Sequence, residues 1–373
     1  TVQKPHPYGM DNTVTLWVND VNHNGVIYGN PDTQTTGGLN SGEGIYAYAS
    51  MGRGGRDIYA LDITNKNAPT LMWQINGGQT TGFEKLGQTW SAPIKTKIKV
   101  GSTITDVLIF AGGYDDTQDD LNQPDSVHRV DAKGNALYIV NARTGALIWS
   151  ASNDSGTVQL PKMKYSIPST VRVVDIQQQN GALISDPDQL ADQIFFGDMG
   201  GQVWRFFINN GNSAATLVSP GGTSGDGIFA SLGGIDPASA RRFYHEPDVS
   251  IVLKAGVRNL AVSIGSGYRG HPLNKIIRDR FYSLRTTQLT NPGGGTINEG
   301  TRTESDLYDA TANLVQSSNA TTSSAAETLL ASRQGWYITL AGDGEKVLSR
   351  ALTVGGEIFV NTYEPSSVAG QCK

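Results

Sequence analysis

The feature that most constrains the fold of this chain is a recurring group of short apolar segments, the last of which carries a tryptophan. Within each segment apolar and polar residues alternate, and Gly, Asn or Asp stands at the boundaries, which is typical of short β-strands. The clearest copies are NARTGALIWS and DMGGQVWRFF, and DITNKNAPTLMWQ is a looser one. Because three or four short strands cannot close a hydrophobic core alone, such units must stack, as the blades of a β-propeller do.

Two further units follow the three that carry tryptophan. FYHEPDVSIVLKAG, NLAVSIGSGYR and DRFYSLRTT give a fourth, and residues 335–365 give most of a fifth. The 45 glycines among 373 residues also favour strands and turns over helices. We therefore predict an all-β chain with a single domain, residues 1–373, folded as a modified β-propeller with incomplete or irregular blades and long loop insertions. The alternative is a β-sandwich with long loops, and the repeated Trp-bearing strand argues against it.

Two stretches rich in Gly, Ser, Thr and Asn interrupt the strand pattern, at residues 209–240 and 287–334. Since strand-like segments resume after each, we interpret both as long surface excursions from the blades rather than as linkers between domains. The segment SSAAETLLASR, residues 323–333, predicts a short helix inside the second excursion.

Charge and hydropathy exclude several classes of partner. The net charge is −5 with a pI near 5.6, and no cluster of Lys and Arg is interleaved with aromatic residues, so nucleic acid is not an expected partner. No run of 18 or more apolar residues exists, so we expect no membrane span in this segment. The single cysteine, Cys372, fits an excised fragment whose disulfide partner lies elsewhere at least as well as a free thiol.

The loop VNDVNHNGVIYGNPD, residues 18–32, carries the spacing of a calcium loop. Asp20, Asn22 and Asn24 place an oxygen ligand at every second position, Gly25 stands where such a loop turns sharply, and the Val26 carbonyl would be the backbone ligand. The position for the closing bidentate carboxylate holds Pro31, and the nearest acid is Asp32, one residue late. We predict a Ca²⁺ site here. The alternative is a metal-free turn, because Asn and Asp side chains also bond their own backbone in such loops.

A second acidic segment is the next choice for a metal. Asp175, Gln177 and Gln179 keep the alternate spacing, and Asp192 lies downstream before the next strand. Because Gln is a poor substitute for Asp in a cation site, this segment ranks below the first. The denser cluster YDDTQDDLNQPD, residues 114–125, lacks the alternation, and we expect a solvated loop there.

Groupings of catalytic residues are sparse. The five histidines are scattered with no His-x-x-x-His pair and no Cys partner, so we expect no zinc site. Ser266 lies in GSGYRGHP, which lacks the strand-to-helix setting of a hydrolase nucleophile. Nothing in these residues requires an enzyme.

The order of several strings resembles one family. HPYGMD, GRGGRDIYALDIT, FAGGYDD, NALYIVNARTGALIW, DQIFFGDMGGQVWRF, GSGYRGHPLN and GWYITLAGDGEKVLSRALTVGGEIFVNTYEP are similar to the C-terminal domain of the PilY/PilC family of type IV pilus-associated adhesins. The resemblance covers nearly the whole chain. It implies a non-enzymatic, exported module at the pilus tip, outer membrane or cell surface that supports pilus assembly, twitching motility and adhesion. The implied partners are minor pilins or other pilus components and a host-cell or abiotic surface, and the family's N-terminal region is absent from this chain.

The resemblance also bears on the metal. It implies a Ca²⁺ loop just before QIFFGDMGG, which corresponds to Asp175 through Asp192, with Gln177 and Gln179 at positions where acids or Asn are expected. Two alternatives to a Ca²⁺-binding pilus module remain. One is a propeller dehydrogenase dependent on pyrroloquinoline quinone, because such enzymes share NARTGALIW, although one cysteine cannot supply their vicinal disulfide. The other is a metal-free propeller scaffold.

Overall fold

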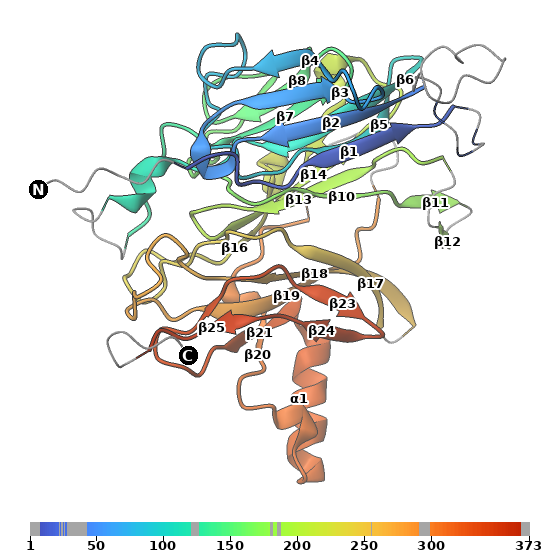
Figure 1. The fold of residues 1–373 in the computed structure, drawn as a ribbon. Coiled ribbons are helices and arrows are strands. Elements are labelled where there is room, and N and C mark those ends of the chain that lie inside the picture. The colour runs from blue at the N-terminus through green and yellow to red at the C-terminus, as the bar shows by residue number, and fades with distance from the viewer. Residues whose placement is uncertain are drawn as a thin grey trace, which may run out of the picture.

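The structure, a computed structural model, consists mostly of β-strands arranged in separate antiparallel sheets. It describes residues 8–21, 23, 25, 27, 43–120, 127–179, 182–184, 188–254, 256–290 and 299–366. Figure 1 shows the sheets layered from β1–β8 at the top to the C-terminal strands at the bottom, with a helix that projects from the body. No helix among the described residues has both the length and the apolar character that a membrane crossing requires.

The first two sheets follow chain order. The first runs β1 (Thr15–Asn19), β2 (Gly44–Ser50), β3 (Ile58–Asp62) and β4 (Thr70–Ile75). The second runs β5 (Ile94–Val100), β6 (Thr103–Ala111), β7 (Ala136–Asn141), β8 (Leu147–Ser152) and the short parallel strand β9 (Val158–Gln159). Each sheet therefore builds from sequential hairpins, the connection that antiparallel blades use.

The third and fourth sheets are less regular. The third pairs β10 (Arg172–Val174), β13 (Gln193–Gly197), β14 (Gln202–Ile208) and β15 (Val218–Pro220), and β16 (Ile228–Ser231) also pairs with β14. The fourth has the order β17 (Asp248–Lys254), β18 (Val257–Gly265), β19 (Arg280–Thr286), β21 (Gly335–Thr339) and β20 (Tyr308–Asp309).

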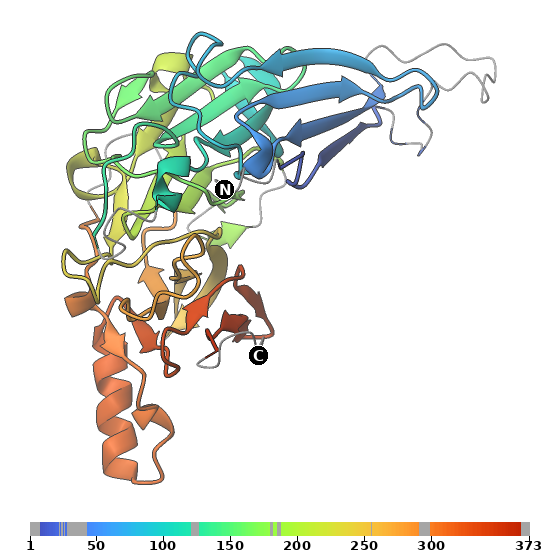
Figure 2. The same cartoon turned by 60° about the vertical axis from the view of Figure 1, so that its left-hand side comes forward.

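Smaller elements complete the fold. The pairs β11 (Gln177–Gln179) with β12 (Ala182–Ile184), β22 (Lys346–Val347) with β25 (Thr362–Tyr363), and β23 (Leu352–Val354) with β24 (Glu357–Phe359) form two-stranded sheets. Short 3₁₀ turns include η2 (Gly52–Gly54) and η3 (Asp116–Asp119). The helix α1 (Ala320–Ser332) begins at Asn319, whose side chain accepts hydrogen bonds from two backbone N–H groups of the first turn. It stands away from the sheets in both views (Figures 1 and 2).

The hydrophobic cores lie between neighbouring sheets. Strand β6 shows how the sequence produces this arrangement, because its alternate residues face two different cores. Leu108 and Phe110 pack toward the first sheet, whereas Val107 and Ile109 belong to the core shared with the third sheet. A sheet buried on both faces has a continuous apolar run rather than an alternating one, which accounts for the segment VLIFA. A further core joins the third sheet to the fourth.

The recurring tryptophans fill these intersheet cores. Trp73 packs between the first and second sheets, and Trp149 and Trp204 pack between the second and third. The Trp73 indole N–H donates to the Ala142 carbonyl at 3.0 Å. Gly145 adopts a φ of +71° and lies so close to Trp73 that a Cβ there would be 2.8 Å from the ring. The turn NARTG therefore packs against Trp73 of the first sheet and also connects β7 to β8.

A buried ion cluster joins the third sheet to the fourth. Arg205 of β14 and Glu299 make two hydrogen bonds of 2.9 Å, and the Thr286 hydroxyl of β19 donates to the same carboxylate at 2.9 Å. The Arg302 guanidinium lies 3.6 Å from the same carboxylate. The Arg205 side chain is fully buried, and those of Glu299 and Arg302 are each 5% exposed. This cluster therefore ties the two sheets to the segment that precedes α1.

The architecture confirms the expected β-propeller-type fold, with stacked blades and long insertions, and no sheet formed by the described residues closes into a barrel. The expected helix is confirmed as α1. The predicted fifth unit is wrong in part: β21 completes the fourth sheet by pairing with β19, although the long excursion separates them in sequence. The first excursion also differs from the expectation, because its strands β15 and β16 pair with β14.

Candidate functional site where the four sheets meet

The residues predicted to bind Ca²⁺ lie only in part within the described structure. Asn22, Asn24, Val26 and Asp32 lie outside it. Asp20 follows β1 directly, and its Oδ2 atom accepts a hydrogen bond from the Gly25 N–H at 2.7 Å. Gly25 has a φ of +77°, so the chain turns at this glycine, as the sequence pattern predicts. A metal-free polar loop can make this bond as well as a Ca²⁺ loop, and the site stays a prediction.

The second predicted loop has a different backbone from the one expected. Gln177 and Gln179 belong to β11, which pairs with β12 in a hairpin, and their side chains lie outside the description. Asp175 is exposed, while the Asp192 Oδ2 atom accepts the Ile176 N–H at 2.8 Å. Asp192 thus secures the start of the hairpin. Among the described residues, no group of three or more His, Cys, Asp or Glu side chains is arranged to hold a metal.

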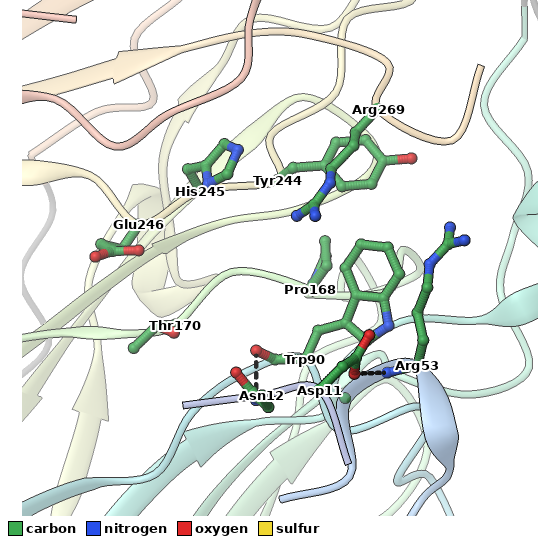
Figure 3. A pocket seen from close by; sticks show the side chains of 11 residues that line it. Asp11, Asn12, Arg53, Trp90, Pro168, Thr170, Tyr244, His245, Glu246 and Arg269 are labelled. Atoms are coloured by element: carbon green, nitrogen blue, oxygen red, sulfur yellow. Dashed lines mark hydrogen bonds between the residues drawn. The ribbon is translucent and has the colours of Figure 1, made fainter. Parts of the chain in front are cut away.

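A polar pocket lies where loops from all four sheets converge, and we consider it the candidate site (Figure 3). It has a volume of about 150 Å³ and is lined by residues before β1, in η2, in the connections that lead from each sheet to the next, and in the loop between β18 and β19, which carries Arg269. Its lining residues are Asp11, Asn12, Gly52, Arg53, Trp90, Pro168, Thr170, Tyr244, His245, Glu246 and Arg269. In Figure 3, Tyr244, His245 and Arg269 lie along one side, facing Asp11, Asn12 and Trp90.

The floor of the pocket rests on an aromatic cluster. Trp90 stacks on Tyr114 with ring centroids 4.3 Å apart, and Tyr244 lies 6.1 Å from Trp90. Burial raises the pKa of the Tyr114 and Tyr244 hydroxyls, so both stay protonated. Because these rings come from three different connections, the cluster fixes the loops relative to one another and gives the pocket a rigid base.

Two arginines lie over the Trp90 ring. The guanidinium carbons of Arg53 and Arg269 are 5.0 and 5.3 Å from the ring centroid, within the range of cation–π interactions. Arg53 also makes a salt bridge of 3.4 Å with Asp119, whose other oxygen accepts the Tyr114 hydroxyl at 2.8 Å. The positive charge at the pocket is therefore held in place by aromatic rings.

Asp115 and Asp119 correct the expectation of a purely solvated loop at residues 114–125. Asp115 is almost fully buried, and its carboxylate accepts the backbone N–H groups of Thr117, Ala132 and Lys133. Asp119 contacts the arginine beside the pocket. The acidic composition was clear from the sequence, but burial of a loop depends on what packs over it, which no local pattern records.

The imidazole of His245 is largely buried at the wall of the pocket. Among the described residues its Nε2 atom has no hydrogen-bond partner. Burial, with the nearby positive charge of Arg269 as the second cause, lowers the pKa of His245 to about 4, so the ring is neutral at pH 7. Glu246, the next residue, makes an ion pair of 3.4 Å with Arg350.

Two buried carboxylates near this region serve the fold. Asp131 accepts the Ser166 N–H and the Gln118 amide, both at 2.7 Å, and Asp198 accepts the Trp204 indole N–H at 2.8 Å. Burial raises the pKa of Asp131 to about 6 and that of Asp198 to about 7. Neither residue lines the pocket, and we assign both to holding turns together.

Sequence reasoning missed this pocket because its residues are distributed along most of the chain. One local signal could have found part of it. An aromatic residue followed three positions later by proline occurs at Trp90–Pro93, Tyr165–Pro168 and Tyr244–Pro247, each before the first strand of the next sheet. All three aromatic residues lie in or against the central aromatic cluster. The recurring pattern therefore marks the connections in which the chain passes the central aromatic cluster on its way from one sheet to the next.

The sequence is similar to those of two known proteins. No protein-family model matches the chain. The chain is 24% identical over 335 residues to the Type IV pilus biogenesis factor PilY1 homolog of Xylella fastidiosa, a match covering 84% of this chain and 20% of that protein. It is 25% identical over 176 residues to the Type IV pilus biogenesis factor PilY1 of Pseudomonas aeruginosa, covering 46% of this chain and 12% of the relative. The matches thus span a fifth or less of these relatives' lengths.

A solved structure has a similar fold. The crystal structure of the Pseudomonas aeruginosa PilY1 C-terminal domain superposes with a TM-score of 0.58 at 19% identity, covering 86% of this chain and 65% of that one. The stacked sheets and the convergence of their connecting loops define a β-propeller-type module. More particularly, the chain is similar to PilY1 proteins in sequence and to the PilY1 C-terminal domain in fold, and one match of each kind covers most of its length. The resemblance inferred from the sequence is thereby confirmed.

Proposed function

We propose that this chain is the propeller module of a type IV pilus biogenesis factor, exported and associated with the pilus, and that it acts by binding rather than by catalysis. The observation that carries the proposal is the match over 84% of the chain to a protein described as a type IV pilus biogenesis factor. The similar fold of the PilY1 C-terminal domain supports it.

The partners in this proposal are minor pilins or other pilus components, with a host-cell or abiotic surface as a further contact. The module would act at the pilus tip, outer membrane or cell surface, and support pilus assembly, twitching motility and adhesion. A rigid stack of sheets that presents several loops at one mouth suits such binding, because the scaffold holds the loops in a fixed arrangement.

The test uses the organism that encodes the chain. Removing this segment in frame, with the rest of the gene intact, should reduce the pilin recovered from the cell surface by shearing and reduce the twitching zone. Immunoblots for the truncated protein and for total pilin are the controls. Unchanged surface pilin and twitching in cells that lack the segment would refute the proposal.

We also propose that the loop after β1 binds Ca²⁺, with Asp20, Asn22, Asn24, the Val26 carbonyl and Asp32 as ligands. The support is the bond between the Asp20 carboxylate and the Gly25 N–H, which curves the chain around the carboxylate. Oxygen donors of this kind suit a hard cation, and the bound ion would order the loop.

Calorimetry with Ca²⁺ after chelation tests this site. Asp20→Ala should abolish the binding heat, whereas Asp154→Ala, which removes an exposed carboxylate paired with Lys85, should not. If Asp192→Asn abolishes the heat and Asp20→Ala leaves it, the ion binds at the second predicted segment instead. No heat from the unaltered protein would favour the metal-free scaffold.

The quinone-dependent dehydrogenase is not favoured by the central pocket. Its volume of about 150 Å³ is below the roughly 300–1,000 Å³ of pockets that enclose ligands of cofactor size. Quinone absorbance in the purified protein, or oxidation of an alcohol coupled to reduction of a dye, would instead support the dehydrogenase.

A further inference from the structure

Two polar groups at the central pocket have no hydrogen-bond partner among the described residues. Among the described residues, the buried Nε2 atom of His245 makes no hydrogen bond, and the Arg269 guanidinium makes neither a hydrogen bond nor an ion pair. Arg269 is exposed and lies over the Trp90 ring. Figure 3 shows both side chains on the same side of the pocket.

The other charged groups at the pocket have partners within the protein. Asp11 accepts the backbone N–H of Arg53 at 2.7 Å, and the Arg53 guanidinium pairs with Asp119. Glu246 pairs with Arg350 at 3.4 Å. Arg269 is thus the cation at this site whose charge no described side chain neutralises, and an anion is the ligand that would complete it.

The size and surroundings of the pocket select among anions. Its volume of about 150 Å³ suits a single side chain or a chain end. A planar guanidinium forms paired hydrogen bonds with a planar carboxylate, and a neutral imidazole can donate one more. Asp11 and Glu246 line the same pocket and repel a doubly charged phosphate more strongly than a singly charged carboxylate.

We propose that this pocket binds a carboxylate of an acidic peptide, with Arg269 and the Nε2–H of His245 as donors and Trp90 as the base. The carboxylate belongs to the C-terminus of the peptide or to an Asp or Glu side chain. This binding rests on the geometry of the pocket alone, so it stands independently of the role in pilus biogenesis.

Calorimetry with small probes tests the ligand class and separates the two sources of carboxylate. The probes are N-acetyl-triglycine with a free C-terminus, the same peptide with an amidated C-terminus, an N-acetylated aspartyl amide, and inorganic phosphate. We expect one or both carboxylate probes to bind and the amidated tripeptide not to bind. Equal binding of the amidated peptide, tighter binding of phosphate, or no binding of either carboxylate probe would overturn the proposal.

Variants connect the binding to the named donors. Arg269→Gln should weaken carboxylate binding at least tenfold. Arg269→Lys keeps the charge without the planar guanidinium, so its affinity should lie between those of Arg269→Gln and the unaltered protein. Lys162→Gln, the same charge change at an exposed lysine that does not line the pocket, should leave affinity unchanged. Because Arg269 is exposed, its variants should unfold at the temperature of the unaltered protein.

A second readout follows His245 itself. A bound carboxylate supplies a negative charge beside the ring, so the His245 pKa measured by NMR should rise toward its ordinary value when the carboxylate probe is added. An unchanged His245 titration at a saturating probe concentration, or Arg269→Gln binding as tightly as the unaltered protein, would show that the carboxylate binds elsewhere.

Discussion

The buried cluster of Arg205, Glu299 and Arg302 gives a sharp test of how the third and fourth sheets are joined. The perturbation is Glu299→Gln, which keeps the shape of the side chain and removes its charge. The variant leaves two buried guanidiniums without a counter-ion, since the side chains of all three residues are at most 5% exposed. One of the two hydrogen bonds from Arg205 to Glu299 is also lost, because an amide nitrogen cannot accept it.

The expected loss of stability is about 3–5 kcal/mol, the size seen when one partner of a buried ion pair is removed. Adding Arg302→Met to Glu299→Gln should recover part of this loss, because one uncompensated buried cation is then gone and Met can pack on the Phe229 ring that the Arg302 guanidinium covers. In contrast, Lys162→Gln breaks a pair whose lysine is 61% exposed, and it should change stability by about 1 kcal/mol or less.

Urea unfolding followed by tryptophan fluorescence measures these differences, with the unfolding midpoint and slope fitted for each variant. The reasoning fails if Glu299→Gln unfolds within about 0.5 kcal/mol of the unaltered protein, the range of an ordinary surface substitution. It also fails if the double variant, with Arg302→Met added, is less stable than Glu299→Gln alone.

Two other predictions follow from the cores and the pocket. His245 has a pKa of about 4 in the folded protein and about 6.5 when unfolded, so the stability it contributes is present above pH 6.5 and is lost as pH falls toward 4. Between pH 7.5 and pH 4, the unaltered protein should lose up to about 3 kcal/mol relative to His245→Gln in urea unfolding, and an unchanged difference would contradict the assignment. Gly145→Ala should destabilise the fold by about 2–4 kcal/mol, since the steric clash of its Cβ with Trp73 adds to the strain of a φ of +71°, whereas Gly101→Ala, with a φ of +58° and open space around it, should cost about 1 kcal/mol from backbone strain alone. Equal losses for the two glycine variants in thermal unfolding would refute the intersheet contact.

The sequence predicted the blade units well because period 2 and turn residues are local signals. The segments around Trp73, Trp149 and Trp204 all form strands of stacked sheets. Residues 335–339 were assigned to the wrong unit, since nothing local to Gly335 records that it pairs with Leu284 beyond a long excursion. Strand pairing at large sequence separation is a property of the whole fold, and only the pairing itself reveals it.

The candidate site was harder to predict than the fold. The alternating oxygen ligands after Asp20 are a contiguous motif and could be found by eye, and the metal they would bind stays a prediction. No regular interval in the sequence relates Arg53, Trp90 and Arg269. They lie close together only because the chain returns to the same pocket after each successive sheet. A site assembled by topology leaves no contiguous motif, although the recurrent aromatic-x-x-Pro segments mark where the chain passes.

The location of the cores between sheets has a mechanical consequence. Backbone hydrogen-bond ladders run within each sheet, whereas side-chain packing such as that of Trp73, Trp149 and Trp204 joins one sheet to the next. Tension applied to the two ends would first separate neighbouring sheets and would then unzip their ladders in turn. The extension under force should therefore proceed in several steps, so that the molecule dissipates a pull gradually instead of failing at one point.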